Sequence, residues 1–239
     1  MQAIQTVGII GAGTMGNGIA QACATCGINV VMVDISQAAV DKGLATVSSS
    51  LDRLIKKEKI TADDKAAALA GITVATDYAA LAGAQLVIEA ATENEELKIK
   101  ILQQLDAMLA KETLIASNTS SISITKLAAA TQRASQFIGM HFFNPVPMMT
   151  LVEIIRGLQT SDATHEAVKT LAETLGKTPI TVKNAPGFVV NRILVPMINE
   201  AFFVLAEGLA TPEDIDAGMK LGCNHPIGPL ALADMIGLD

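Results

Sequence analysis

The 239-residue sequence predicts an α/β fold, in which a doubly wound, mainly parallel sheet is followed by a smaller all-helical domain. Segments typical of strands alternate with segments typical of helices through most of the chain. The strand segments are continuous apolar runs, as in sheets that are covered on both faces. The alternation stops at "NAPGFVVNR", after which only helical patterns follow. We therefore predict an α/β domain at 1–185 and a helical domain at 186–239.

The first elements form a strand–helix–strand unit. "TVGIIGAG" is β-branched and apolar, as a buried parallel strand should be, and "TMGNGIAQACATCG" is rich in small, helix-compatible residues. "INVVMVD" is a second apolar run, and it closes on Asp34. This order is that of a βαβ unit, the building block of parallel sheets.

The later elements continue the alternation. Ser36 and Thr61 are good N-caps for the next two helices, and the periodicity of "NEELKIKILQQLDAMLAK" predicts an amphipathic helix. The predicted helices are 36–60, 61–71, 94–111, 123–129 and 164–176, and the predicted strands are 72–77, 84–91, 113–119, 135–143, 149–155 and 178–184.

The helical domain is predicted to contain three helices. The first, 187–210, is long and apolar, with Pro196 as a kink. Thr211 caps the second, with Pro212 at its first position, and the third starts at Gly228.

Composition excludes several classes of protein. The 17 basic and 24 acidic residues give a formal charge of −7, too acidic for general nucleic-acid binding. No apolar run is long enough to cross a bilayer, and the N-terminus has no signal-peptide pattern. Three cysteines do not make a disulfide framework, so we expect a cytoplasmic protein. The acids and histidines lack metal-ligand spacing.

A glycine motif points to a dinucleotide. Residues 11–16, "GAGTMG", read G-x-G-x-x-G between a strand and a helix, the Rossmann fingerprint. Gly11 would permit the tight turn, Gly13 the approach of a pyrophosphate, and Gly16 close helix–strand packing. Asp34 stands where an acid binds the ribose 2′-hydroxyl, which favours NAD(H) over NADP(H). The alternatives are a glycine turn without a ligand and an Asp34 that merely ends a surface strand.

One of three histidines is a candidate proton carrier. His141 follows a buried-looking strand and stands near Glu153 on the next, whereas His165 lies in a polar helical stretch and is expected to be solvated. His225 is a turn candidate. Histidine suits proton transfer near neutral pH, but a packed core histidine remains the alternative for His141.

Several blocks together resemble a known family. "GIIGAGTMGNGIA", "EAATENEELK", "ASNTSSISIT", "GMHFFNPVPMMTLVEII", "NAPGFVVNRIL" and "GCNHPIGPLALADMIGLD" occur in order over nearly the whole chain. The sequence thereby resembles the short-chain L-3-hydroxyacyl-CoA dehydrogenases, most closely the bacterial 3-hydroxybutyryl-CoA dehydrogenases. The resemblance implies NAD(H)-dependent interconversion of short-chain 3-hydroxyacyl-CoA and 3-ketoacyl-CoA esters.

The resemblance also implies roles for individual residues. His141 and Glu153 match the family's acid–base pair, and Ser120 and Asn191 match residues that hold the substrate oxygens. The residues implied at the cofactor are Gly11, Gly13, Thr14, Met15, Gly16, Asp34, Glu93, Lys98, Asn118 and Ser120. Ser50 and Lys57 match positions that contact the CoA, within a basic cluster formed with Arg53, Lys56 and Lys59.

Two further expectations concern the helical domain. The family usually continues beyond "MIGLD", so the second domain is expected to be truncated. The apolar stretch "VPMINEAFFVLAEGL" predicts a homodimer formed through the helical domain.

Two other functions compete with the interpretation that the substrate is a CoA ester. The first is oxidation of a free β-hydroxy acid or sugar acid, and the second is NAD binding without catalysis.

Overall fold

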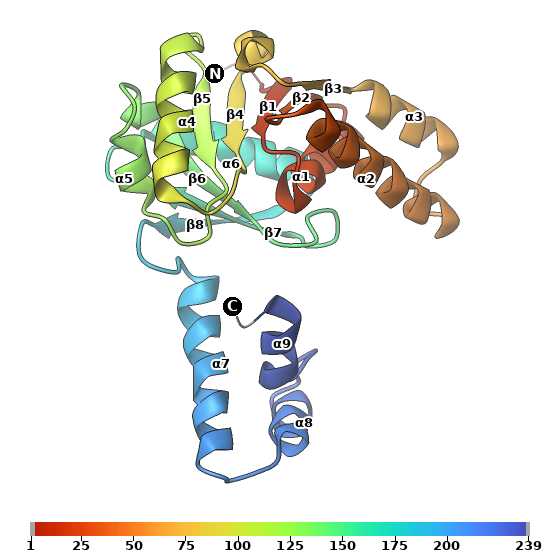
Figure 1. Cartoon of the computed structure of the whole chain (residues 1–239), viewed down its shortest axis with the longest axis vertical. Coiled ribbons are helices and arrows are strands. Elements are labelled where there is room, and N and C mark those ends of the chain that lie inside the picture. The colour runs from red at the N-terminus through yellow and green to blue at the C-terminus, as the bar shows by residue number, and fades with distance from the viewer. Residues whose placement is uncertain (1–2, 238–239) are drawn as a thin grey trace. The chain divides into compact units, whose positions relative to one another are not determined.

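The computed structural model describes residues 3–237 and consists of two compact units, Met1–Pro186 and Gly187–Asp239. The first unit is built on one eight-stranded sheet with the strand order β3-β2-β1-β4-β5-β6-β7-β8 (Figure 1). Its strands are β1 (Thr6–Ile10), β2 (Asn29–Val33), β3 (Ile72–Ala75), β4 (Leu86–Glu89), β5 (Leu114–Ser117), β6 (Phe137–Phe142), β7 (Leu151–Arg156) and β8 (Thr178–Lys183).

The sheet is parallel except where β6 meets β7. From β1 the chain moves outward through β2 to β3, and then returns to the other side of β1 as β4. This reversal opens a crevice at the carboxyl ends of β1 and β4, where such sheets bind their ligands. The predicted doubly wound, mainly parallel α/β fold is therefore confirmed.

Helices cover the sheet. They are α1 (Thr14–Thr25), α2 (Gln37–Lys56), α3 (Ala62–Ala70), α4 (Glu95–Met108), α5 (Ile124–Ala128) and α6 (Asp162–Thr174), with 3₁₀ turns η1 (Tyr78–Gly83) and η2 (Ala134–Gln136). Ser36 caps α2 by accepting from the amide of Ala39, and Thr61 and Asp64 form a capping box on α3. Every residue of β4, β5 and β6 is buried, as expected of strands with both faces covered.

Small residues let α1 lie close to the sheet. A Cβ at Gly16 would stand 1.7 Å from the carbonyl oxygen of Gly11, and one at Gly18 would stand 2.9 Å from Val146. A larger side chain would clash with the glycine loop at residue 16 and with the segment after β6 at residue 18. Gly16 and Gly18 are therefore a requirement of packing.

The second unit contains α7 (Val190–Ala206), α8 (Pro212–Gly222) and α9 (Pro229–Ile236). Pro196 lies inside α7, and Thr211 caps α8 as predicted. Helix α7 begins later than predicted, because Gly187 and Phe188 have φ values of 74° and 51°, which are incompatible with a right-handed helix.

The core of this unit is small and includes Ala201, Ile215 and Leu230. Several of its large apolar side chains are more than half exposed: Ile193, Val195, Phe203, Leu209, Leu221, Met235 and Ile236. Across residues 3–237, no helix combines the length and the apolar character that a membrane span requires.

Candidate active site

The glycine loop lies at the carboxyl end of β1. Gly11 has a φ of 99°, and a Cβ there would stand 2.6 Å from the carbonyl oxygen of Ala90, so only glycine fits. A Cβ at Gly13 would meet nothing within 4 Å, so its backbone faces open space. This is the approach that a pyrophosphate needs at the N-terminus of α1.

Asp34 lies beside this loop. Its carboxylate accepts from the amide of Ala12 at 2.7 Å and from that of Ile35 at 2.7 Å, which fixes the acid against the glycine turn. Both Asp34 and Gly13 line a cavity of about 460 Å³. The other residues lining it are Ile10, Gly11, Ile35, Thr76, Tyr78, Ala90, Ala91, Thr92, Leu97, Lys100, Ile101 and Gln104.

Tyr78 is a cavity residue that sequence reasoning missed. Burial raises the pKa of its hydroxyl, and the negative charges of Asp34 and Glu89 raise it further. Its position on a short 3₁₀ turn between strands carries no motif that could have identified it.

His141 and Glu153 face each other across the antiparallel step of the sheet. They are direct register partners on β6 and β7, and His141 Nδ1 lies 2.8 Å from Glu153 Oε2. Glu153 is completely buried and His141 is 5% exposed. Because β7 runs opposite to β6, its beginning lies at the same edge of the sheet as the carboxyl ends of the parallel strands.

Neighbouring groups hold the histidine in place. The ring of Phe143 packs against His141 with centroids 4.5 Å apart and the planes tilted by 54°. The Asn118 side-chain oxygen accepts from the amide of Phe142 at 2.9 Å, which ties the end of β5 to the strand that carries His141. Asn118 was expected at the cofactor; in this structure its oxygen organises the strand end.

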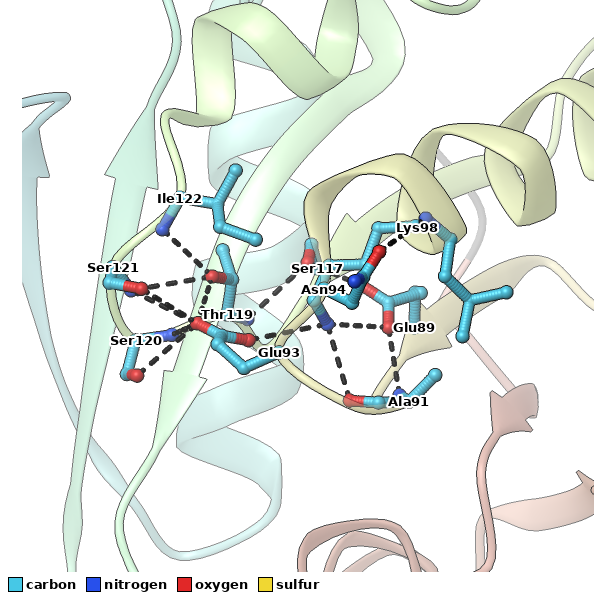
Figure 2. A network of polar contacts seen from close by, with 11 residues as sticks. Glu89, Ala91, Glu93, Asn94, Lys98, Ser117, Thr119, Ser120, Ser121 and Ile122 are labelled. Carbon is cyan, nitrogen blue, oxygen red and sulfur yellow. Dashed lines mark hydrogen bonds and ion pairs between the residues drawn. The ribbon is translucent and has the colours of Figure 1, made fainter. Parts of the chain in front are cut away.

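Glu93 accepts several hydrogen bonds from the loop that follows β5 (Figure 2). Its Oε1 accepts from Thr119 Oγ1, from the amide of Ser120 at 2.9 Å and from that of Ser121 at 3.2 Å. The hydroxyls of Ser120 and Ser121 lie 3.3 and 3.1 Å from the same oxygen. Ser120, the predicted substrate contact, is thus held by an acid that precedes it by 27 residues.

A buried ion pair lies beside Glu93. Lys98 Nζ donates to Glu89 Oε1 at 2.7 Å and lies 3.5 Å from Glu93 Oε2. Ser117 Oγ donates to the other oxygen of Glu89 at 2.7 Å. Sequence reasoning assigned no role to Glu89 or Ser117, although a glutamate that ends the apolar run "LVIE" was a usable signal.

The environment of Glu93 favours its charged form. Partial burial alone would raise the pKa of this carboxyl, but the hydrogen bond from Thr119, the charge of Lys98 and the donors of Ser120 and Ser121 outweigh it. The pKa of Glu93 is therefore lower than usual. An anionic Glu93 is the form that can accept from all its neighbours.

Other predicted residues lie elsewhere. Ser50 is on α2 and Lys57 caps its C-terminus, beside the exposed Arg53, Lys56 and Lys59. Within residues 3–237, no hydrogen bond or ion pair joins them to Glu93 or Asp34. Asn191 belongs to the second unit, in the first turn of α7.

The expectation that His165 is solvated is wrong. The side chain is 8% exposed, and its Nε2 lies 2.8 Å from Thr181 Oγ1 on β8. Asp162 and Glu166 beside it are exposed, but Thr164 and His165 lie on the buried face of α6. Among the described residues, no group of three or more histidines, cysteines or acids is placed to hold a metal ion.

The residues at the glycine loop fit NAD. The open space at Gly13 leaves room for phosphates, while the fixed carboxylate of Asp34 offers an acceptor to a ribose hydroxyl and would repel a 2′-phosphate.

Comparisons with known proteins agree with this fit. Residues 6–185 match the family described as 3-hydroxyacyl-CoA dehydrogenase, NAD binding domain, and residues 187–239 match its C-terminal domain. A 3-hydroxybutyryl-CoA dehydrogenase of Bradyrhizobium diazoefficiens is 53% identical over 99% of this chain and 80% of its own length. A probable 3-hydroxybutyryl-CoA dehydrogenase of Deinococcus radiodurans is 53% identical over 97% of this chain and 83% of its own.

A solved structure is also similar. The crystal structure of (S)-3-hydroxybutyryl-CoA dehydrogenase from Ralstonia eutropha superposes with a TM-score of 0.97 at 74% identity, covering 98% of this chain and 83% of that one.

Proposed function

Because the chain belongs to the 3-hydroxyacyl-CoA dehydrogenase family, and is thus an NAD-dependent oxidoreductase, we propose that it interconverts (S)-3-hydroxybutyryl-CoA and acetoacetyl-CoA. The observation that carries this proposal is the buried His141–Glu153 pair at the edge of the sheet that also bears the glycine loop. Relatives with these names supply the substrate class. NAD, when bound, accepts a hydride from carbon 3 of the substrate and donates it in the reverse direction.

His141 is the proposed proton carrier. The Glu153 carboxylate can only accept, so the neutral ring keeps its hydrogen on Nδ1 and Nε2 is the basic nitrogen. In oxidation Nε2 takes the proton of the 3-hydroxyl, and in reduction the imidazolium returns it to the carbonyl oxygen. Glu153 fixes the tautomer and stabilises the charged ring.

The remaining roles follow the family resemblance. The glycine loop, with Thr14 and Met15, would hold the pyrophosphate, and Asp34 the adenosine ribose. Ser120 and Asn191 would hold the substrate oxygen in a reactive pose. Glu93, Lys98 and Asn118 are proposed near the nicotinamide.

The basic cluster is the proposed CoA site. Arg53, Lys56, Lys57 and Lys59 are exposed at the end of α2, and Ser50 is one turn or two before them. Four cations in a chain of formal charge −7 form a local attraction for the phosphates of CoA.

A homodimer formed through the helical unit, 186–239, is also proposed. Its support is the set of exposed apolar side chains on α7 to α9, which includes Ile193 and Phe203 at 65% and 54%. Sedimentation velocity at micromolar concentration tests it, and a stable monomer would contradict it. The cytoplasmic location stays a prediction from the cysteine count.

Following NADH absorbance with acetoacetyl-CoA tests the proposed function. We expect turnover with this ester, little with free acetoacetate, and a kcat/KM at least about tenfold lower with NADPH, because Asp34 repels its phosphate. A Lys56→Glu/Lys57→Glu variant should raise KM for the ester severalfold, whereas Lys42→Glu on the same helix should not.

Two outcomes would favour the competing functions. Preferred turnover of free acetoacetate, unaffected by the charge reversal, would indicate a β-hydroxy acid dehydrogenase. NADH binding without turnover of either substrate would indicate an NAD-binding protein without this activity.

A further inference from the structure

We propose that Glu93 and the buried Glu89–Lys98 ion pair are positioning residues, which act together to hold the loop 117–122 so that Ser120 is presented to the substrate. The inference deepens the proposed function and rests on it for the role of Ser120. It assigns Glu89, Ser117 and Thr119, which carried no role, and it gives Lys98 a second role beside its proposed place near the nicotinamide.

Two hydrogen bonds and an ion pair hold Lys98. Its Nζ donates to Glu89 Oε1 at 2.7 Å and to the carbonyl oxygen of Ala91 at 3.3 Å, and it lies 3.5 Å from Glu93 Oε2. The Lys98 side chain is also only 1% exposed. The lysine therefore holds the two acids in place relative to each other.

The two acids, Glu89 and Glu93, hold the same loop from two points. Glu89 reaches it through Ser117, whose hydroxyl donates to Glu89 and accepts from the amide of Thr119 at 3.3 Å. Glu93 reaches it directly, through Thr119 and Ser120. Lys98 joins the two acids, so the ends of β4, β5 and the start of α4 form one polar network (Figure 2).

Thr119 lies at the centre of the loop's hydrogen bonds and is 1% exposed. Its hydroxyl donates to Glu93 and accepts from the amides of Ile122 at 2.9 Å and Ser121 at 3.3 Å. The turn is therefore closed around one side chain, and that side chain is anchored by Glu93. Loss of the Glu93 carboxylate would remove the anchor from the whole turn.

The hydroxyl of Ser120 stays available to a substrate. Glu93 Oε1 has five neighbouring donors, more than its two lone pairs can serve well. The Ser120 hydroxyl, at 3.3 Å, is the most distant of the five, whereas the Ser120 amide lies at 2.9 Å. The backbone of Ser120 is thus held firmly, and its hydroxyl can turn to a substrate oxygen at little cost.

Amide hydrogen exchange on full-length variants tests the proposal. In Glu93→Gln we expect exchange at residues 119–122 to accelerate at least about tenfold, because the anionic acceptor is lost. The matched control is Glu96→Gln, an exposed glutamate in the first turn of α4, which should leave exchange unchanged. Unchanged exchange in Glu93→Gln would overturn the proposal.

A second, double variant is included because removing a single buried charge can prevent folding. Lys98→Met alone leaves Glu89 as a buried, unpaired charge, but Glu89→Gln/Lys98→Met removes both charges together. The double variant should fold, accelerate exchange in the same loop, and lower kcat for acetoacetyl-CoA more than it changes the Kd for NADH. Wild-type exchange in a folded double variant would contradict the proposal.

The exchange readout is independent of the proposed function. If the wild-type protein fails to turn over acetoacetyl-CoA, the proposed function fails, while loop exchange in the variants still decides whether these acids hold the loop. If turnover succeeds and loop exchange is insensitive to Glu93, only the positioning role fails.

Discussion

Two buried glutamates at one edge of the sheet have different partners. Glu89 and Glu153 are both completely buried, and each lies within 2.8 Å of a basic nitrogen, Lys98 Nζ or His141 Nδ1. The Lys98 ammonium is surrounded by Glu89, the carbonyl oxygen of Ala91 and Glu93. His141 is paired with Glu153 and packs against the ring of Phe143.

The difference teaches what separates a structural pair from a reactive one. In both pairs a hydrogen bond compensates the cost of burying a carboxylate. Imidazole is a side chain that enzymes use to carry a proton during a reaction, whereas the Lys98 ammonium joins two acids. We therefore propose that the first pair shapes the site and that the second performs its chemistry.

Replacing His141 should give the largest effect. In His141→Gln we expect kcat for acetoacetyl-CoA reduction to fall about 10³-fold, since general acid catalysis contributes about 10² to 10⁴. His165 is a matched control, because it is also buried and hydrogen-bonded. His165→Gln should keep kcat within about twofold. Equal losses in both variants would mean that His141 is only a packed histidine.

Breaking the other pair should affect stability instead. Lys98→Met leaves Glu89 unpaired in the core and should lower the free energy of unfolding by about 3–5 kcal/mol. Glu89→Gln/Lys98→Met should lose much less, because no buried charge remains. Urea denaturation of the two variants measures this, and equal losses would show that packing, not charge, dominates.

Glu153→Gln should sharpen the contrast between the two acids. The amide preserves shape but removes the charge that fixes and stabilises the protonated ring of His141. We expect kcat to fall about 10²-fold with a melting temperature near that of the wild type. A variant that retains full kcat would remove Glu153 from the mechanism.

Glu93 should make a smaller, pH-dependent contribution to stability. Its folded pKa is lowered from 4.5, so its stabilising effect is present above that pH and is lost as the pH falls through the folded pKa. The melting temperature of Glu93→Gln should therefore lie below that of the wild type at pH 7 and converge with it in acid. A difference that persists in acid would show that the charge is not responsible.

The smallest expected effect concerns the number of thiols that react in the folded protein. Burial raises the pKa of Cys23 to about 12, with a further contribution from Cys26, whereas Cys26 and Cys223 are exposed. Below the ordinary value of 9.0 the folded protein should show two reactive thiols to a chromogenic disulfide reagent. A third, slow thiol should appear on unfolding; three fast thiols would contradict the burial of Cys23.

Much of the fold could be predicted from local patterns. Apolar runs identified the strands, and the position of "GAGTMG" between a strand and a helix identified the loop that faces the cavity. The start of α7 was predicted too early, because the positive φ values of Gly187 and Phe188 are not marked by any strong helix stop.

The site was predicted only in part, for a physical reason. His141 and Glu153 could be proposed as neighbours, but their direct pairing depends on the reversal of β7, which the alternating pattern does not reveal. The Glu93 network joins residues 26 to 28 positions apart, and only the parallel pairing of β4 and β5 brings them together.

Measuring kcat for acetoacetyl-CoA reduction together with amide exchange at residues 119–122, in Glu153→Gln and in Glu89→Gln/Lys98→Met, tests the central claim most directly. We predict that Glu153→Gln lowers kcat about 10²-fold and leaves exchange in this loop unchanged, because its carboxylate acts on His141. The double variant should accelerate exchange in the loop and lower kcat less than Glu153→Gln does. The reverse pattern, with faster loop exchange in Glu153→Gln and the larger loss of kcat in the double variant, would contradict the assignment of the two pairs.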